Sequence, residues 1–256
     1  MKHTSCILFC RCGANLISDK RADDLANSLK ELDADVIELH DLCAFSVHAP
    51  QKLVEMVAGY RQKTIVACYP RAIKYLLQQG GAELGDYRVL NFRELNDESI
   101  ITQLHTTHSI ARGEANYRLE RTDLTVPAWY PVIDVSRCTV CGQCARFCLF
   151  GVYRFKRKSL EVVNPLSCKN NCPACGRTCP AQAIIFPRLV ENSVLSGALP
   201  TAISAKNEGQ QSSLLAQLNQ RNQARQSIFR PDVLKLAEDE RQQALEEIKK
   251  MNRLND

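Results

Sequence analysis

Short apolar runs alternate with amphipathic stretches along the first part of the chain. Each apolar run has the length of a buried strand, and together they cover residues 6–10, 35–39, 64–69 and 87–92. Helical patterns lie between them, over residues 18–32, 51–60 and 70–79, with Ser18 as a cap of the first and Pro70 at the start of the third. Because strands that alternate with helices pair in parallel, residues 1–95 are predicted to form an α/β domain with a parallel sheet covered on both faces.

The pattern changes after residue 95. Residues 96–130 open with a helical pattern over 97–111 and are predicted to be a helical connector. His105 and His108 near the end of this pattern are expected to be exposed polar residues, because two histidines do not make a metal site. Trp129 and Tyr130, at the end of the connector, are expected to pack under a metal cluster or at a domain interface.

Two further segments complete the expected organisation. Residues 131–190 hold short apolar groups around two cysteine-rich runs, which predicts an α+β domain of short strands around loop–helix units. Residues 191–256 begin with a polar stretch typical of a flexible linker. They continue with helical patterns over 214–229 and 232–254, the second with an apolar stripe, and are predicted to be a helical C-terminal tail.

Composition places the chain among ordinary globular proteins, apart from its cysteines. It has 256 residues, of which 45% are hydrophobic and 24% charged. No apolar run reaches the roughly 18 residues that would cross a bilayer, and the start lacks a signal peptide. We therefore expect a cytoplasmic protein without membrane insertion. In a reducing compartment, an odd total of 13 cysteines argues for metal ligands or catalytic thiols rather than a disulfide framework.

Eight of the cysteines form two runs of four. The spacings are Cys138-x2-Cys141-x2-Cys144-x3-Cys148 and Cys168-x3-Cys172-x2-Cys175-x3-Cys179. In the bacterial ferredoxin pattern, three close cysteines hold one [4Fe-4S] cluster and the fourth ligates the other cluster. The spacing therefore predicts two clusters, one on Cys138, Cys141, Cys144 and Cys179 and one on Cys168, Cys172, Cys175 and Cys148. Structural zinc is the alternative, but zinc sites usually need only two cysteine pairs.

Residues 133–187 resemble the 2[4Fe-4S] ferredoxin family. The resemblance implies a ferredoxin-like fold and single-electron transfer. Two departures from the family pattern leave every ligand in place: Leu149 stands where the family has proline, and the second run has one extra residue between Cys168 and Cys172.

Four other cysteines are predicted to meet at one edge of the sheet. Cys10 and Cys12 follow the first predicted strand, Cys43 follows the second and Cys68 ends the third, and such carboxyl ends are where open α/β sheets build their sites. Cys6, at the start of the first strand, is expected to be a core thiol. No glycine-rich phosphate motif competes for this edge, so no flavin or nucleotide site is expected. We favour a third Fe–S cluster, with free thiols, zinc or a thiol–disulfide pair left open.

A second resemblance concerns this edge. The stretches LFCRCGANL, LC at 42–43 and VACYPR at 66–71 resemble the amino-terminal domain of the FAD-containing component of heterodisulfide reductase. The resemblance implies that Cys10, Cys12, Cys43 and Cys68 are cluster ligands and that the chain works within a cytoplasmic, anaerobic, multi-subunit oxidoreductase. No flavin domain is recognisable in the sequence, so flavin-based bifurcation is not carried over.

Charge adds expectations about partners. Residues 131–190 contain nine Lys/Arg and two Asp/Glu, whereas residues 1–95 contain twelve of each. The basic run 154–158, expected at a hairpin, is predicted to face an acidic surface of a redox partner, with a solvated turn as the alternative. No DNA-binding module is evident, so no nucleic acid is expected. The C-terminal helices are expected to dock on a partner.

Three functions fit these patterns. We favour an electron-transfer subunit of an oxidoreductase complex, with no catalytic residue of its own. The alternatives are a disulfide or thiol reductase that acts at the N-terminal cysteines, and an Fe–S sensor or assembly factor.

Overall fold

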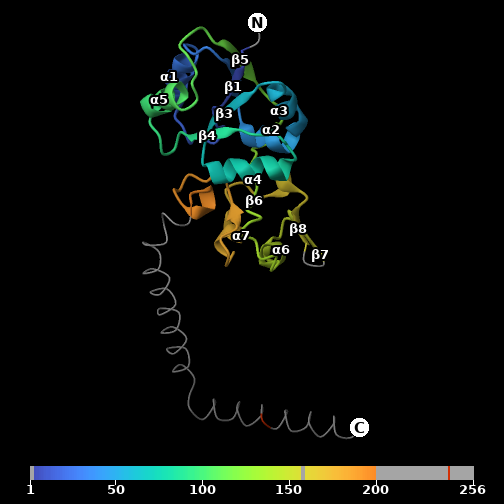
Figure 1. Ribbon diagram of the computed structural model, residues 1–256. Helices are drawn as coiled ribbons and strands as arrows, with labels where there is room; N and C mark the ends of the chain where they lie inside the picture. The colour runs from blue at the N-terminus through green and yellow to red at the C-terminus, as the bar shows by residue number, and fades with distance from the viewer. Residues whose placement is uncertain (1–2, 157–158, 200–241, 243–256) are drawn as a thin grey trace, which may run out of the picture. The chain divides into compact units, whose positions relative to one another are not determined.

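The computed structural model describes residues 3–156, 159–199 and 242 (Figure 1). The prediction of a flexible linker from residue 191 is wrong for residues 191–199, which contain a short 3-10 helix (Val194–Ser196) with Val194 and Ser196 buried. The rest of the predicted linker and the tail helices lie outside the described residues, apart from Gln242. Residues up to 199 belong to one compact unit. Among the described residues, no helix combines the length and the apolar character that a membrane span requires.

A parallel sheet of five strands forms the amino-terminal part. Its strand order is β4-β3-β1-β2-β5, and all four pairings are parallel. The strands are β1 (Ser5–Cys10), β2 (Asp35–Leu39), β3 (Gln62–Ala67), β4 (Arg88–Asn91) and β5 (Asn116–Glu120). Strands β1 and β2 are buried along their whole length, as expected for the centre of a sheet covered on both faces.

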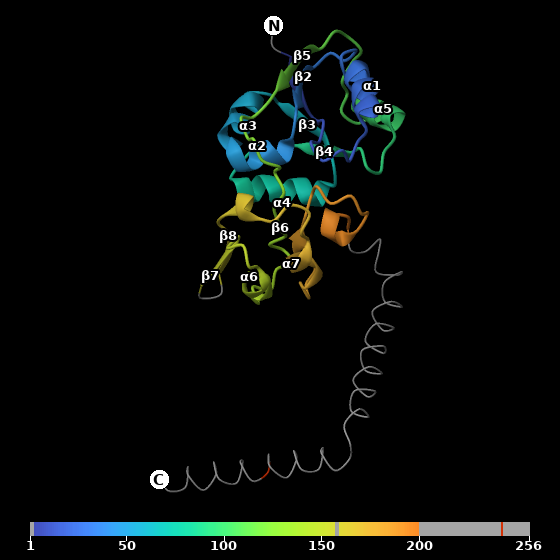
Figure 2. The same cartoon turned by 180° about the vertical axis from the view of Figure 1, so that it is seen from behind.

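Helices cover both faces of the sheet. They are α1 (Asp19–Leu29), α2 (Leu42–His48), α3 (Pro50–Val57), α4 (Pro70–Gly80) and α5 (Asp97–Thr106). Helices α1 and α5 contact each other on one face, and α2 contacts α3 and α4 on the other, as the opposite views in Figures 1 and 2 show. The predicted α/β fold with a parallel sheet is thus confirmed. Ser18 caps α1 as expected, since its side chain accepts a hydrogen bond from the Arg21 amide.

The structure corrects the prediction for residues 96–130. Helix α5 ends at Thr106, and β5 adds an edge strand to the sheet instead of a helical connector. The apolar–polar alternation in NYRLE is weak, which fits an edge strand that pairs with β2 alone among the described strands and stays partly exposed. The expectation of exposed histidines is wrong for His108, which is buried and hydrogen-bonded through Nδ1 to Thr64 Oγ1 at 2.7 Å. Burial, with Arg88 nearby, lowers the pKa of His108.

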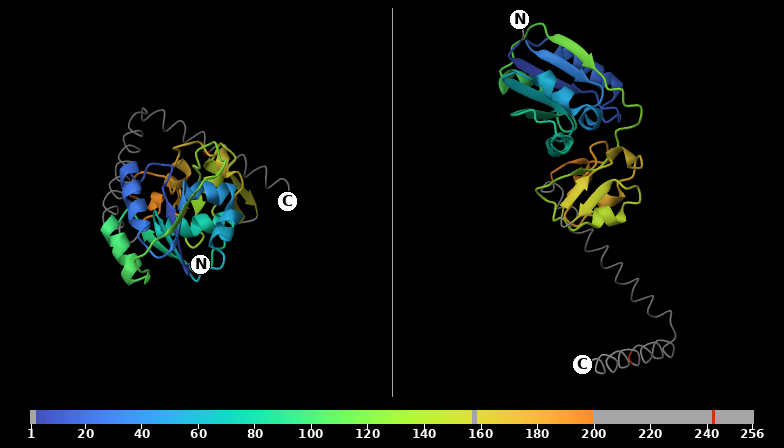
Figure 3. Two further views of the ribbon diagram at one scale, coloured as in Figure 1. Left: turned by 90° about the horizontal axis from the view of Figure 1, so that it is seen from above. Right: turned by 90° about the vertical axis from the view of Figure 1, so that its right-hand side faces the viewer.

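The cysteine-rich part contains two small antiparallel sheets. Strand β6 (Val132–Ile133) pairs with β9 (Ile184–Ile185), and β7 (Tyr153–Lys156) pairs with β8 (Ser159–Val162) in the hairpin expected for the basic run. Two short helices, α6 (Gln143–Phe147) and α7 (Ala174–Arg177), contact each other. Figure 3 shows the ribbon from two further directions. The core here is small and includes two cysteines; it consists of Trp129, Ile133, Cys144, Cys175, Ile184 and Phe186.

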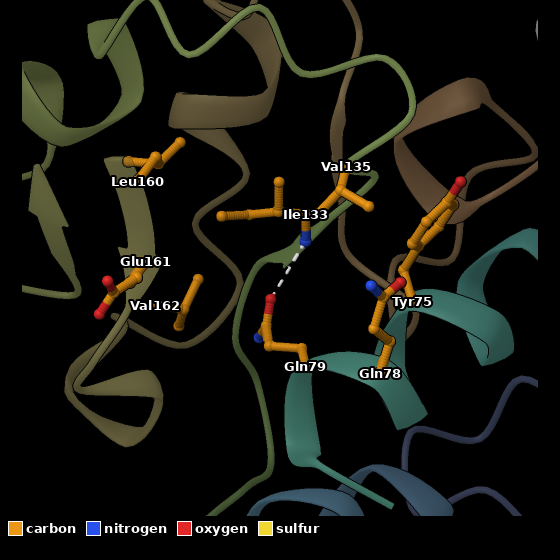
Figure 4. Close-up of a pocket in the computed structure, with 8 residues that line it drawn as sticks. All are labelled: Tyr75, Gln78, Gln79, Ile133, Val135, Leu160, Glu161 and Val162. Atoms are coloured by element: carbon orange, nitrogen blue, oxygen red, sulfur yellow. Dashed lines mark hydrogen bonds between the residues drawn. The ribbon is translucent and has the colours of Figure 1, made fainter. Parts of the chain in front are cut away.

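Helix α4 joins the two parts of this unit. Its Gln79 accepts a hydrogen bond from the Ile133 amide of β6 at 3.1 Å, at one side of a cleft of about 370 Å³ (Figure 4). Arg71, in the first turn of α4, makes a buried ion pair of 2.6 Å with Asp134. The same guanidinium donates to the carbonyls of Gln182 at 2.8 Å and Val194 at 3.0 Å. One side chain thus ties the helix to the Asp134 carboxylate before the two cysteine runs and to backbone carbonyls after them.

Replacing Arg71 by methionine is expected to lower the free energy of unfolding by about 3–5 kcal/mol, because the buried Asp134 would lose its cation. Anaerobic urea unfolding of the cluster-loaded chain measures this loss. Lys74→Met, at an exposed position of the same helix, is the matched control and should cost less than about 0.5 kcal/mol. Equal costs for the two variants would contradict the assignment of Arg71 as the anchor.

Candidate metal centres

The two cysteine runs come together at α6 and α7. Cys144 lies in α6 and Cys148 is its C-cap residue, while Cys175 lies in α7. Cys144 and Cys175 are buried, Cys141 is exposed and the other five ferredoxin-type cysteines are half-buried. Gly142 caps α6 with a φ of +74°, and a Cβ there would meet the Phe155 ring at 2.7 Å, so this loop requires glycine.

Thiols from both runs lie beside one another, in two groups that share Cys175. Burial raises the pKa of Cys168 to about 12, and the neighbouring thiols of Cys175, Cys172 and Cys148 contribute to this rise. Burial likewise raises the pKa of Cys144 to about 12, with Cys175, Cys179 and Cys138 nearby. Cys148 therefore lies among the thiols of the second run and Cys179 beside those of the first. This is the arrangement that exchanged fourth ligands need.

A cavity of about 470 Å³ lies at the group of thiols around Cys168. Its lining includes Cys148, Cys168, Cys172 and Cys175, the four ligands predicted for the second cluster, and it is otherwise mainly apolar. Thiolate ligands in a largely apolar, partly enclosed space fit the requirements of an Fe–S cluster. In the part of the chain that the structure describes, no three His, Cys, Asp or Glu side chains converge on a single metal ion.

Hydrogen-bond donors surround the sulfurs of this group. The Tyr153 hydroxyl donates to Cys175 Sγ at 3.2 Å. Trp129 stacks on Phe186 with 5.2 Å between ring centroids, and its buried Nε1 has no hydrogen-bond partner of good geometry among the described residues. The indole nevertheless lies close enough to Cys168 to lower the pKa of that thiol against the effect of burial. Trp129 thus packs beside Cys168, one of the predicted ligands, and its indole N–H is available to the sulfur of that residue.

The four amino-terminal cysteines also come together. Cys10 ends β1, Cys12 follows it, Cys43 lies in the first turn of α2 and Cys68 follows β3. All four are buried, and each has at least one other member of the group as an electrostatic neighbour. Strands β1 and β3 are adjacent but lead to helices on opposite faces, so the site lies where open α/β sheets bind ligands. Cys6 lies at the other end of β1 and is 1% exposed.

Burial dominates the acidity of these four thiols. It raises the pKa of Cys10 and Cys43 well above the ordinary value and that of Cys68 to about 12. Backbone amides oppose this effect: the Leu42 amide donates to Cys10 Sγ at 3.4 Å, and amides of Ala14 and Leu16 lower the pKa of Cys12. Cys12 itself has a φ of +60°, a strained conformation that turns the loop back toward the sheet edge.

Two charged residues, Asp41 and Arg188, lie beside the four cysteines. Asp41 caps α2 by accepting a hydrogen bond from the Cys43 amide at 2.9 Å. Arg188, from the cysteine-rich part, pairs with Asp41 at 3.2 Å and donates to the Gly13 carbonyl at 2.5 Å. Tyr130 donates to the Cys43 carbonyl at 2.7 Å. The sequence singled out Tyr130 but did not reveal Asp41 and Arg188 as parts of this site, because Arg188 lies far away in the chain and only the Asp41 cap has a local signal.

Comparison with known proteins gives one informative relative. The chain is 43% identical over 72 residues to a protein of Methanocaldococcus jannaschii described as an uncharacterized ferredoxin. The match covers 28% of this chain and 47% of the relative, so the chain spans about half the length of that protein. No family model and no solved structure matches the chain. The similarity supports a ferredoxin-like Fe–S domain, whereas the resemblance of residues 1–95 to heterodisulfide reductase finds no support in these comparisons.

Proposed function

We propose that the chain is an electron-transfer subunit of a multi-subunit oxidoreductase, with two [4Fe-4S] clusters in its cysteine-rich part and a third Fe–S cluster at the sheet edge. The observation that carries the proposal is the proximity of thiols from both runs: Cys148 lies with Cys168, Cys172 and Cys175 at one cavity, and Cys179 lies near Cys144. When bound, such clusters accept and release one electron at a time.

The protein's own residues supply ligands, charge and shielding. Eight cysteines would hold the two clusters of the cysteine-rich part. Burial raises the pKa of Cys144, Cys168 and Cys175, so these thiols must lose their protons when iron binds. The hydroxyl of Tyr153 stabilises negative charge on the Cys175 sulfur. The amides near Cys10 and Cys12 do the same at the sheet edge.

The third cluster would be held by Cys10, Cys12, Cys43 and Cys68. Arg188 contributes a cation that lowers the pKa of Cys12 and of Asp41 against burial. Asp41, which pairs with Arg188 at 3.2 Å, acts in the opposite direction and raises the pKa of Cys10, Cys12 and Cys43, so the cation at this site is balanced by a carboxylate. The resemblance to the FAD-containing component of heterodisulfide reductase is a second argument for these four ligands and for a cytoplasmic complex.

A thiol reductase acting at the amino-terminal cysteines is less well supported. Reactive cysteines are partly exposed and have lowered pKa values, because the thiolate is the nucleophile. Here burial raises the pKa of Cys10, Cys43 and Cys68, so all three stay protonated near neutral pH without a metal. This environment favours a cluster over thiol–disulfide chemistry.

The partner in this proposal presents carboxylates near the basic run 154–158. Arg154 already pairs with Glu161 of the same hairpin, so Lys156 is the cation of the run, among the residues described, that an acidic partner could engage. The tail helices, outside the described residues, would supply a second contact with the complex.

Iron and sulfide analysis of anaerobically prepared protein tests the cluster count. We expect about twelve irons per chain for three [4Fe-4S] clusters. About eight irons with four titratable thiols would remove the third cluster from the proposal. Zinc in place of iron would contradict it entirely.

Tyr153→Phe is expected to lower the reduction potential of one cluster. The lost hydrogen bond to Cys175 is worth about 1 kcal/mol, which is about 40 mV for one electron, since about 59 mV corresponds to a tenfold change. Potentiometric titration followed by electron paramagnetic resonance measures the shift. Tyr117→Phe, on β5, is the control and should leave every potential of the cysteine-rich part unchanged; a potential unaffected by Tyr153→Phe would exclude this role for the hydroxyl.

A further inference from the structure

Three large apolar side chains are exposed next to one candidate ligand. Phe147, Leu149 and Phe150 are 52%, 90% and 44% exposed, and they surround Cys148 in the sequence. The buried core of this part is small and does not use them. Exposed apolar groups of this size, gathered at one place, are typical of an interaction site.

The same side chains line the cavity of about 470 Å³ at the thiols around Cys168. Phe147, Leu149 and Phe150 share its lining with Cys148, Cys168 and Cys172. A protein that covers this surface would therefore come within contact of the ligands themselves. It would also exclude water from the cavity, as the centre of an interface does.

Cations border the apolar group. Arg146 and Lys169 line the same cavity, and both are exposed. Within residues 3–156 and 159–199, neither has an ion-pair partner, whereas Arg154 is paired with Glu161 and Asp134 with Arg71. Residues 131–190 contain only these two acids against nine Lys/Arg, so the field over this surface is positive.

We propose that Arg146, Phe147, Leu149, Phe150 and Lys169 form the docking surface for a redox protein whose own contact face has an apolar centre and a rim of carboxylates. This inference rests on the proposed electron-transfer function and places the exchange of electrons at the second cluster. A second copy of this chain would bring Arg146 and Lys169 against the same cations, so charge complementarity selects an acidic partner.

The test uses the cluster-loaded full chain, reduced with dithionite, and an acidic flavodoxin as the oxidised probe protein. Stopped-flow mixing measures the second-order rate constant of electron transfer. Leu149→Ser is expected to lower it roughly tenfold, as loss of a central apolar contact does. Arg146→Glu is expected to lower it by a similar factor at low salt and to weaken its dependence on ionic strength. Val190→Ser, at another position that is 74% exposed, is the matched control and should change nothing.

Three outcomes would overturn the proposal. The first is an unchanged rate constant and salt dependence in Leu149→Ser and Arg146→Glu. The second is an equal loss in Val190→Ser. The third is a dimer of the native chain, seen by analytical ultracentrifugation, that dissociates in Leu149→Ser, because the occupant would then be a second copy. Reduction of each variant by dithionite reports separately on the clusters, so a failure of the proposed function is distinguishable from a failure of the docking surface.

Discussion

Cys43→Ala is expected to remove about four irons per chain and leave the clusters of the cysteine-rich part intact. Cys43 lies in the first turn of α2, buried beside Cys10, Cys12 and Cys68, and a cubane that loses one of four thiolates is poorly held. Iron and sulfide analysis after anaerobic preparation measures the loss. Electron paramagnetic resonance of the reduced protein should retain the signals of the two remaining clusters.

Cys6→Ala is the matched control for this experiment. Cys6 is also buried, but it lies at the opposite end of β1 from Cys10. The substitution also removes one buried sulfur from the α/β part and should leave the iron content unchanged. If Cys43→Ala keeps all of its iron, or if both variants lose it equally, the sheet-edge cluster is wrong.

Cys148→Ala is expected to damage the second cluster although Cys148 belongs to the first run. The thiols around it are Cys168, Cys172 and Cys175, and all four line one cavity. Iron content should fall by about four per chain, since the cluster loses a ligand. Magnetic interaction between the two reduced clusters should disappear from the spectrum.

Double substitutions make this assignment decisive, because ligands of one cluster act as a unit and their losses do not add. Cys148→Ala combined with Cys168→Ala should lose no more iron than either single variant. Cys148→Ala combined with Cys138→Ala should lose about eight irons, since each of the two clusters then lacks one ligand. The reverse result would mean that each run holds its own cluster.

Much of the fold could be predicted because its signals are local. Strands β1 to β4 are short apolar runs, Ser18 caps α1, and Pro70 opens α4, so pattern and capping were sufficient. The convergence of Cys10, Cys43 and Cys68 followed from topology alone, because parallel strands end at one edge.

What could not be predicted depends on contacts between distant residues. Strand β5 is recognisable only beside β2, since NYRLE has neither a buried run nor a clean alternation. Helix α2 is too short to show a period and was missed for that reason. The pairs of Arg188 with Asp41 and Arg71 with Asp134 join separate segments, and no spacing rule links such residues in a sequence.

The Arg71 anchor has a consequence for biogenesis. The sheet and α4 precede the cysteine-rich segment in the chain, so during synthesis they emerge and fold first. The later segment has too small a core to fold well without metal, but Asp134 and Gln182 can already attach to a finished helix. We therefore expect the newly made cysteine-rich segment to attach to α4 before its clusters form. In this partly folded state it would be accessible to iron delivery and protected from proteolysis.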